Sequence, residues 1–408
     1  MRIQLLIQRE PFFDILKNTL ESYWSQKYDK PIRIEWIKKG NLTKGNNQIW
    51  YCNHWINAIF TKNPDPELFD PLRKEFSRST KFWRRFAQSL FVDLSTSNRW
   101  AHLIAQSKFH VQPAIEDNDQ SMIVPGNNKI RILDSTKNTS TSIVKHGFSS
   151  DYLKNELSAR QQAEKLSLPV PKILEQNLEQ GWFKEEYISG KPLNRLSDQE
   201  LAWNTFLLAY DKLSVLHNDT AQQQGFSEYG NQLTNQIDRL VRENQLLSHD
   251  QKNSLVQITQ KINSKFDPLF WQGENQLITV QSHGDFQPAN ILLEDETLWI
   301  IDWEYTHRRQ YLYDLLTYVL SARSSIGVSN RLLSFVSSGI HFPGSSQLKT
   351  IWDINNASDK RRFQIISLFA FEELHMHIQE NSNQLFHSIS GGLPILLEEL
   401  SIWTSSFK

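Results

Sequence analysis

The chain has 408 residues, of which 39% are hydrophobic, so it can bury substantial cores in two or three folding units. Its one cysteine, Cys52, excludes an intramolecular disulfide framework and CxxC metal sites, and we expect it to be a small buried side chain. Residues 1–110 contain 18 Lys and Arg and 10 Asp and Glu, so this region has a net charge of +8. Because the whole chain has a net charge of −1, the remaining residues carry −9.

Residues 1–115 have the pattern of a small basic α/β domain. Alternating apolar positions favour strands, and apolar positions three or four apart favour helices. The expected elements are a strand over Arg2–Gln8, a helix over Phe12–Tyr28, strands over Ile32–Ile37 and Gln48–Asn53, and helical stretches to about Ser107. We therefore expect this region to be an accessory domain.

A basic aromatic segment lies inside that region. Positive residues between Arg73 and Arg85 alternate with large rings at Phe76, Phe82, Trp83 and Phe86. Such a helix could meet an anionic partner such as lipid, nucleic acid or glycan. The preferred interpretation is that the aromatic rings pack inside and the charges form a solvated face or dock on the acidic remainder of the chain. No motif for sequence-specific nucleic-acid recognition is present.

A strand-rich segment follows the accessory region. Ser121–Val124 and Lys129–Leu133 are strand-like runs joined by a Pro-Gly-Asn-Asn loop. Gly126, Asn127 and Asn128 tolerate positive φ, so the loop can turn tightly and point backbone N–H groups at phosphates. By itself, the same sequence also fits an ordinary hairpin turn.

Three further elements follow in chain order. The sequence predicts a strand over Thr141–Lys145, an amphipathic helix over Tyr152–Leu168 that a Pro-Val-Pro segment ends, and an apolar strand from Trp182 that runs into a Gly/Pro-containing crossover near Gly190. Such a crossover is typical of a connection between two lobes.

The most informative segment is HGDFQPANILL, residues His283–Leu293, followed by IIDWE at Ile300–Glu304. Two short apolar runs around a polar stretch predict an antiparallel hairpin centred on Glu296. In that register Ile291 faces Ile301. Asn290 then lies opposite Asp302, with Cα atoms roughly 5 Å apart.

The polar residues at the ends of these runs indicate a metal site. An amide oxygen from Asn290 and a carboxylate from Asp302 suit Mg²⁺, which usually takes one or two protein ligands and completes its shell with phosphate and water. Asp285, five residues before Asn290, could accept the proton of an attacking hydroxyl. Each acid alone would be explained as a solvated surface residue, but the whole set at this spacing would not.

These residues resemble the catalytic and metal-binding segment of the aminoglycoside phosphotransferase and choline kinase-like family. Gly284 stands where protein kinases usually have Arg, which favours the small-molecule branch. The resemblance covers about residues 116–408. It implies an α+β, bilobal protein-kinase-like fold, with a β-rich N-lobe over residues 116–190 and a helical C-lobe over residues 191–408, preceded by the domain of residues 1–115.

The resemblance also implies roles for individual residues. Asp285 would be the catalytic base, Asn290 and Asp302 would hold Mg²⁺, and His283 would brace the loop. His217 and Asp314 match further family positions, and we expect His217 to be structural. Arg309, Gln310 and Tyr311 replace the usual Gly-Asp-Pro approach to that aspartate, which puts the local substrate wall in doubt.

The nucleotide would bind upstream. Lys145 would reach the α- and β-phosphates, and Glu156 would hold it in register, with Glu164 on the same helix as the alternative partner. The loop of Gly126, Asn127 and Asn128 would cradle the phosphates. The adenine edge would meet backbone groups of Glu186, Tyr187 and Ile188.

The sequence therefore predicts an ATP- or GTP-dependent and Mg²⁺-dependent kinase that phosphorylates a hydroxyl of a small molecule: an aminoglycoside, amino alcohol, amino acid or sugar. Acids at Glu372, Glu373 and Glu380 could serve an aminoglycoside, although exposed helical glutamates explain them as well. The alternatives are an inactive kinase-like scaffold, or a kinase whose N-terminal domain recruits a macromolecular or surface-glycan acceptor. Without a secretory or transmembrane run, the expected location is cytoplasmic.

Overall fold

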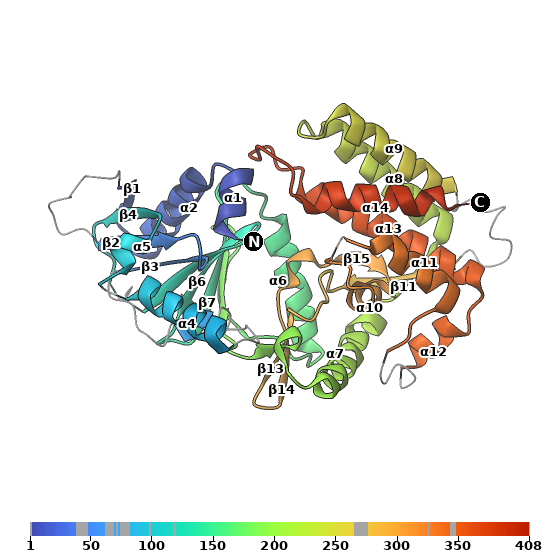
Figure 1. Cartoon of the computed structure of the whole chain (residues 1–408), viewed down its shortest axis with the longest axis horizontal. Helices are drawn as coiled ribbons and strands as arrows, with labels where there is room; N and C mark the ends of the chain where they lie inside the picture. The colour runs from blue at the N-terminus through green and yellow to red at the C-terminus, as the bar shows by residue number, and fades with distance from the viewer. Residues whose placement is uncertain are drawn as a thin grey trace. The chain divides into compact units, whose positions relative to one another are not determined.

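The computed structural model describes residues 2–37, 48–61, 69–70, 72–73, 82–97, 99–116, 120–264, 276–324, 326–342 and 348–407. It divides into two compact units (Figure 1). Unit 1 comprises Met1–Leu153 and Pro171–Ser189, and unit 2 comprises Lys154–Val170 and Gly190–Lys408. Both strands and helices are plentiful, so the α+β class expected from the sequence is confirmed. No helix within the described ranges is long and apolar enough to cross a membrane.

Unit 1 is built on one nine-stranded sheet with the order β1-β4-β2-β3-β5-β6-β7-β9-β8. All of its neighbouring strands pair antiparallel. The strands are β1 (Arg33–Trp36), β2 (Gln48–Asn53), β3 (Ala58–Thr61), β4 (Ser107–Gln112), β5 (Ser121–Pro125), β6 (Lys129–Asp134), β7 (Thr139–Val144), β8 (Ile173–Asn177) and β9 (Trp182–Glu186).

Helices cover both faces of this sheet. Along β2, Trp50 and Cys52 join the core with α1 (Ile3–Arg9) and α2 (Phe12–Lys27). The side chain between them, Tyr51, belongs to a second core with residues of α4 (Phe82–Thr96) and α5 (Ala101–Ile104). Successive side chains of a strand point to opposite faces, so one strand serves both cores. Cys52 is fully buried, as expected.

The predicted division at residue 115 does not match the sheet. Because β3 pairs with β5, strands from the expected accessory region and from the expected N-lobe form one continuous sheet. The second expected boundary, at residue 190, stays a prediction; the last break between the two units lies between Ser189 and Gly190. The region before residue 115 is therefore an extension of the sheet.

The helices and strands of residues 2–112 agree only in part with those expected from the sequence. The run Arg2–Gln8 was expected to be a strand, but Ile3–Arg9 is helical. Ile3 and Leu6 are buried three residues apart whereas Leu5 is 50% exposed, so the burial follows helical spacing and not alternation. The strand at Gln48–Asn53 and the helix from Phe12 are confirmed. β3 lies within the stretch expected to be helical up to about Ser107, and β4 begins where that stretch was expected to end.

Unit 2 is mainly helical, with two small three-stranded sheets of orders β10-β13-β14 and β11-β12-β15. Its strands are β10 (Lys191–Pro192), β11 (Gln222–Gly225), β12 (Gln276–Ser282), β13 (Ile291–Glu294), β14 (Thr297–Ile300) and β15 (His307–Gln310). Its helices are η2 (Leu193–Arg195), α7 (Gln199–Asp219), α8 (Phe226–Glu243), α9 (His249–Asn263), η4 (Trp303–Tyr305), α10 (Tyr313–Val319), α11 (Val328–Ser338), α12 (Lys349–Asn355), α13 (Asp359–Glu380) and α14 (Gly392–Ser405), and α6 (Asp151–Lys165) contributes most of its length.

The hairpin β13–β14 forms as expected but one residue out of register. Ile291 pairs with Ile300, not with Ile301, and the turn consists of two residues, Asp295 and Glu296. Both have positive φ, 44° and 70°. Two consecutive positive φ angles are the pattern of a tight two-residue hairpin turn, in which Asn and Gly are usual. Neither is present here, so the sequence did not indicate this register.

Candidate active site

The loop between β12 and β13 contains His283, Gly284 and Asp285, and a buried carboxylate fixes its backbone. Asp314, at the start of α10, accepts from His283 N at 2.8 Å and from Gly284 N at 2.9 Å. His217, near the end of α7, contacts the same carboxylate at 3.0 Å through Nε2. Burial alone would raise the pKa of Asp314, but the hydrogen bond and charge of His217 and the backbone hydrogen bond from Gly284 lower it overall.

The position between His283 and Asp285 admits only glycine. Gly284 has φ +86°, and a Cβ atom there would lie 1.9 Å from the carbonyl oxygen of Tyr305. An L-residue is strained at such a φ and would also clash with backbone that cannot move independently. Protein kinases usually have Arg at this position. Here glycine is required because the backbone of η4 packs directly against it.

His283 is fully buried and bridges two parts of the loop. Its Nε2 lies 3.0 Å from the carbonyl oxygen of Ile301, and its Nδ1 accepts from Asp285 N at 3.2 Å. Burial lowers the pKa of His283. A neutral ring protonated on Nε2 satisfies both contacts, since it donates to the carbonyl and accepts from the amide. The imidazole therefore ties the loop that contains Asp285 to the segment leading to Asp302.

Asp285 is buried and three side chains donate to its carboxylate. Gln287 Nε2 and Asn290 Nδ2 donate to Oδ2 at 2.8 Å and 2.7 Å, and Arg323 Nε donates to Oδ1. An ionised carboxylate has about four acceptor positions, so these bonds leave roughly one for another donor. Burial raises the pKa of Asp285, while the charge and hydrogen bond of Arg323 act in the opposite direction.

Asn290 and Asp302 are the expected metal ligands. Asn290 Nδ2 donates to both the backbone oxygen and the carboxylate of Asp285, so Oδ1 is the atom of its amide suited to a cation. Ile301 N donates to Asn290 O at 3.0 Å, and Asp302 follows with φ 65° and ψ 62° in the left-handed region. The negative charge of Asp302 also raises the pKa of Asp285, so the two carboxylates lie within electrostatic reach of each other.

This donor set fits Mg²⁺ chemically. Oxygen atoms are the ligands that Mg²⁺ prefers, and Asn290 and Asp302 offer an amide oxygen and a carboxylate. In the described part of the chain, no group of three or more His, Cys, Asp and Glu side chains forms a self-sufficient metal cage. A cation held by one or two protein ligands would share its remaining positions with phosphate and water.

Arg323 is a component of this site that the sequence did not indicate. It lies just beyond α10, and besides Asp285 it donates from Nη1 to Glu373 at 2.7 Å and from Nη2 to the backbone oxygen of Gly284 at 2.6 Å. Glu373 also accepts from the Tyr313 hydroxyl. One guanidinium therefore connects the loop of Asp285 to α13.

The acids proposed for an aminoglycoside serve other contacts. Glu372 is buried and accepts from Gln310 N and from the Tyr229 hydroxyl, each at 2.8 Å. Glu373 is buried against Arg323, so the alternative explanation as exposed helical glutamates is wrong for both residues. Glu380 accepts from the Tyr305 hydroxyl. In these contacts the three carboxylates support the fold of unit 2.

The Arg-Gln-Tyr segment that departs from the family pattern also packs inward. Arg309 Nη1 donates to Ser282 Oγ at 2.8 Å and to Tyr305 O at 2.9 Å, and its guanidinium lies 4.4 Å from the ring centroid of Tyr313. Gln310 Nε2 donates to Glu372 at 2.9 Å. These residues brace the strand before Asp314.

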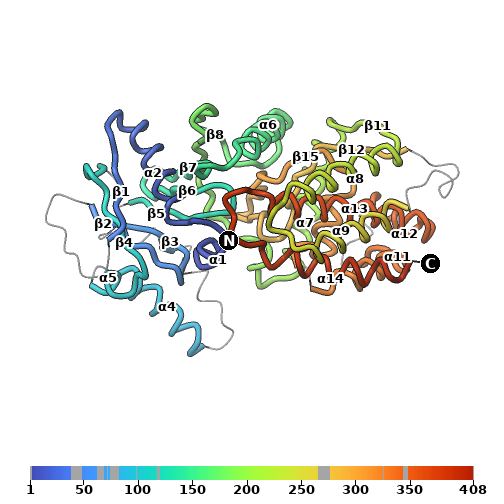
Figure 2. The backbone as a smooth tube through the Cα atoms, turned by 90° about the horizontal axis from the view of Figure 1, so that it is seen from above, coloured from blue at the N-terminus to red at the C-terminus, as the bar shows by residue number. Residues whose placement is uncertain are grey.

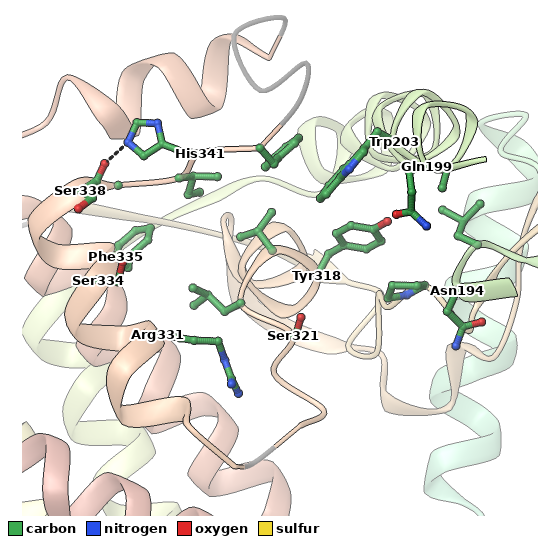
Figure 3. A pocket seen from close by; sticks show the side chains of 18 residues that line it. Asn194, Gln199, Trp203, Tyr318, Ser321, Arg331, Ser334, Phe335, Ser338 and His341 are labelled. Atoms are coloured by element: carbon green, nitrogen blue, oxygen red, sulfur yellow. Dashed lines mark hydrogen bonds between the residues drawn. The ribbon is translucent and has the colours of Figure 1, made fainter. Parts of the chain in front are cut away.

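A cavity of about 550 Å³ adjoins the loop that contains Asp285. Pro288 of that loop lines it together with Tyr318 of α10 and Trp203 of α7, and Arg331 of α11 lines it as well (Figure 3). Its size suits a small molecule. None of the described residues that line it is Asp or Glu, and Arg331 and His341 are the basic side chains among them.

In unit 1, Lys145 has a partner that the sequence did not indicate. Its Nζ lies 2.5 Å from Glu10 Oε1, and both side chains are almost completely buried. Glu10 follows α1 directly, and its other oxygen lies 3.3 Å from Arg9 Nη2. Glu156, the expected partner, is buried on α6.

The expected phosphate loop is a tight turn between β5 and β6. Gly126 N donates to Lys129 O at 2.9 Å, and Lys145 N donates to Asn128 O at 3.0 Å, so the loop and the lysine strand are directly linked. Arg9 Nη2 donates to Asn127 O at 3.3 Å. The N-terminal segment thus contacts both the loop and Lys145.

Two of the expected adenine-binding amides already have partners. Glu186 N donates to Lys172 O and Tyr187 N donates to Asn138 O, each at 3.0 Å. These bonds belong to the end of the sheet, where β9 lies between β7 and β8. The Glu186 carbonyl and the Ile188 N–H are therefore the groups of this segment that we retain as candidates for the adenine edge.

Comparison with known proteins decides the family. Residues 131–334, half of the chain, match the phosphotransferase enzyme family. The chain belongs to this family. The matched span contains Asp285, Asn290 and Asp302 together with the loop that carries them.

Individual relatives are more distant. Over 72 residues the chain is 36% identical to protein LicA of Haemophilus influenzae, a match covering 17% of this chain and 27% of that protein. The chain therefore aligns with only about a quarter of the length of this curated relative. Among solved structures, choline kinase LicA from Streptococcus pneumoniae has 16% identity and a TM-score of 0.43, with 72% of this chain and 92% of that chain covered. The ADP-bound aminoglycoside phosphotransferase APH(2'')-Ib has 16% identity and a TM-score of 0.40, with 68% and 90% covered.

Proposed function

We propose that this phosphotransferase moves the γ-phosphate of ATP to a hydroxyl of a small molecule, with Mg²⁺ bound. The observation that carries the proposal is the environment of Asp285: a buried carboxylate held from three sides, with about one acceptor position left for a donor. A hydroxyl donating to that position would have its oxygen oriented for attack and its proton next to a base.

The proposed reaction is a direct transfer. The acceptor oxygen forms a bond to the γ-phosphorus, the bond from that phosphorus to the β,γ-bridging oxygen breaks, and ADP leaves. The hydroxyl proton passes to Asp285 and then to solvent, so the products are ADP, a phosphate monoester and one proton. Mg²⁺ held by Asn290 and Asp302 would offset negative charge on the phosphates.

Gln287, Asn290 and Arg323 would keep the Asp285 carboxylate in one orientation. His283 would hold the loop backbone, because its two ring nitrogens contact backbone groups on both sides of the site. In unit 1, Lys145 would bind the α- and β-phosphates, and Glu10 would set its position. Glu156 remains the proposed second carboxylate for Lys145 on the grounds of the family resemblance.

We further propose that the acceptor occupies the cavity beside Pro288 and carries at most one positive charge. The aromatic wall of Trp203 and Tyr318 can contact a sugar ring or a single quaternary ammonium. An aminoglycoside carries several ammonium groups, and these would find no carboxylate among the described lining residues. Amino alcohols and sugars are therefore preferred as acceptors.

The test is an acceptor screen with purified protein, Mg²⁺ and γ-labelled ATP. Amino alcohols, neutral sugars, glycan precursors and aminoglycosides would be compared by kcat/KM. Transfer to an amino alcohol or sugar supports both proposals. If an aminoglycoside were the best acceptor, the proposed kinase activity would stand and the proposed acceptor class would be wrong. Nucleotide binding without turnover across the panel would favour an inactive scaffold.

A further inference from the structure

Helix α4 of unit 1 has a large apolar surface facing solvent. Phe82, Trp83 and Phe86 are 69%, 79% and 57% exposed. Leu90, Phe91 and Leu94 continue this surface toward the end of the helix and are also exposed. We call these six side chains the aromatic ridge. The expectation that the aromatic residues of this segment pack inside is therefore wrong for Phe82, Trp83 and Phe86, while Phe76 lies outside the described residues.

The ridge occupies one side of the helix. Phe82, Phe86, Leu90 and Leu94 are spaced by four, which aligns them along one face. Val92, Ser95 and Thr96 are the buried residues of α4, and at 100° per residue they fall on the opposite face. The C-terminal part of α4 therefore packs against unit 1 through the face opposite the ridge. In Figure 2 the helix lies at the edge of this unit.

Positive charge accompanies the ridge. Arg84 and Arg85 are exposed within α4, and Arg99 is exposed just after it. Between Arg73 and Lys108 the sequence has eight Lys and Arg against two Asp and Glu, a balance of +6. Trp100 and Leu103, at and within the short helix α5, are also 50% and 66% exposed. At 100° per residue Arg84 and Arg85 lie outside the ridge, on the polar side of α4, so the apolar side chains and the arginines occupy different sides of an exposed helix.

We propose that α4 binds unit 1 to the surface of an anionic lipid bilayer. The ridge would enter the boundary between headgroups and acyl chains, and the arginines would lie at the level of the anionic headgroups. A helix with one apolar face, aromatic side chains and flanking arginines is the pattern of an interfacial amphipathic helix. The ridge is also convex, and a lipid surface can accommodate a protruding helix without a preformed groove.

The proposal is independent of the acceptor and of the chemistry at Asp285. Binding of this kind would place the protein at a membrane surface as a peripheral protein, and it would not require a membrane-spanning helix. Patches of exposed large apolar side chains of this kind are uncommon on monomeric soluble proteins and mark interaction sites. Here the excess of arginine and lysine selects an anionic surface.

The experiment is co-sedimentation of the full chain with vesicles of phosphatidylcholine alone and with vesicles that also contain the anionic lipid phosphatidylglycerol. We expect binding to the anionic vesicles, weakened by added salt. Replacing Phe82, Trp83 and Phe86 by Ser should reduce the partition coefficient by more than about a hundredfold. R84Q/R85Q should reduce it by roughly thirtyfold, since each charge near the surface contributes about fivefold.

Trp55→Ala provides the matched control, because Trp55 is also an exposed aromatic residue of unit 1, 56% exposed, but lies in the turn between β2 and β3. This variant should bind vesicles like the wild type. Equal binding to neutral and anionic vesicles, or undiminished binding by the triple variant, would overturn the proposal. So would a ridge-dependent dimer in sedimentation velocity combined with no vesicle binding, since a second copy would then cover the ridge.

Discussion

Arg323 donates from Nε to Oδ1 of Asp285, and the two side chains are only 19% and 11% exposed. The same guanidinium donates to Glu373 and the Gly284 carbonyl, and it holds the carboxylate oxygen that Gln287 and Asn290 do not contact. Arg323 is thus a positioning residue for the proposed base. Its charge also opposes the rise in the pKa of Asp285 that burial causes.

Replacing Arg323 by Gln should therefore change the pH dependence of transfer. Burial already raises the pKa of Asp285, and loss of the arginine would raise it further, because the positive charge stabilises the ionised form. The acid limb of kcat/KM against pH should move to higher pH, and the rate should fall about tenfold or more. Arg242→Gln, an exposed arginine on α8, is the control. An unmoved acid limb with an altered Tm would indicate a purely structural arginine.

Gly284→Ala should prevent normal folding of the loop. The new Cβ would meet the Tyr305 carbonyl oxygen at 1.9 Å, and the positive φ adds strain. We expect a loss of more than about 3 kcal/mol of unfolding free energy, or insoluble protein. Gly391→Ala is the matched change, since a Cβ there meets nothing within 4 Å, and it should cost less than about 0.5 kcal/mol. Equal stability of the two variants in urea unfolding would contradict this account of the loop.

Glu372→Gln should alter how stability depends on pH. Burial raises the pKa of Glu372 from 4.5 to about 7, with its hydrogen bonds opposing the rise. Between these values the folded state binds more protons than the unfolded state, so stability falls as pH rises, by roughly 3 kcal/mol for a shift of this size. The variant cannot ionise and should lack this fall.

The measurement is urea unfolding of wild type and E372Q at pH 5 and pH 8. Taking the difference between the two proteins removes the contribution of the other titratable groups. Identical pH dependence in both proteins would show that Glu372 titrates like an exposed glutamate.

Glu10→Gln tests the buried partner of Lys145. Without the carboxylate at 2.5 Å, the ammonium loses one of the contacts that position it, and we expect KM for ATP to rise about tenfold with a smaller change in kcat. Glu179→Gln, an exposed glutamate of the turn between β8 and β9, is the control. A lower KM in E10Q would mean instead that Glu10 competes with the phosphates for Lys145.

The sequence predicted the local parts of the site better than its long-range contacts. The hairpin, the strand ending at Lys145 and the loop at Gly126 follow from short apolar runs and turn residues, and all three are present. Glu10 lies 135 residues from Lys145, and Arg323 lies 38 residues from Asp285. Neither has a local pattern that marks it, because a pairing across the fold leaves no periodicity in the chain.

Two local errors have physical causes. The register of β13–β14 depends on a two-residue turn at Asp295 and Glu296, which adopt positive φ without the Asn or Gly that would announce it. The helix at Ile3–Arg9 is short, and seven residues hold too few turns for helical spacing to be distinguished from alternation. The aromatic ridge contradicts the ordinary rule that aromatic residues are buried, and such exceptions are where interaction surfaces are found.

The central claim, that Asp285 is the base of a phosphotransferase, is tested most directly by γ-phosphate transfer from labelled ATP by D285N, using the acceptor found in the screen. We expect kcat to fall at least about a hundredfold with KM for ATP changed less than about threefold. Asp295→Asn, in the exposed turn of the same hairpin, should transfer phosphate like the wild type. Transfer by D285N at near the wild-type rate would contradict the mechanism.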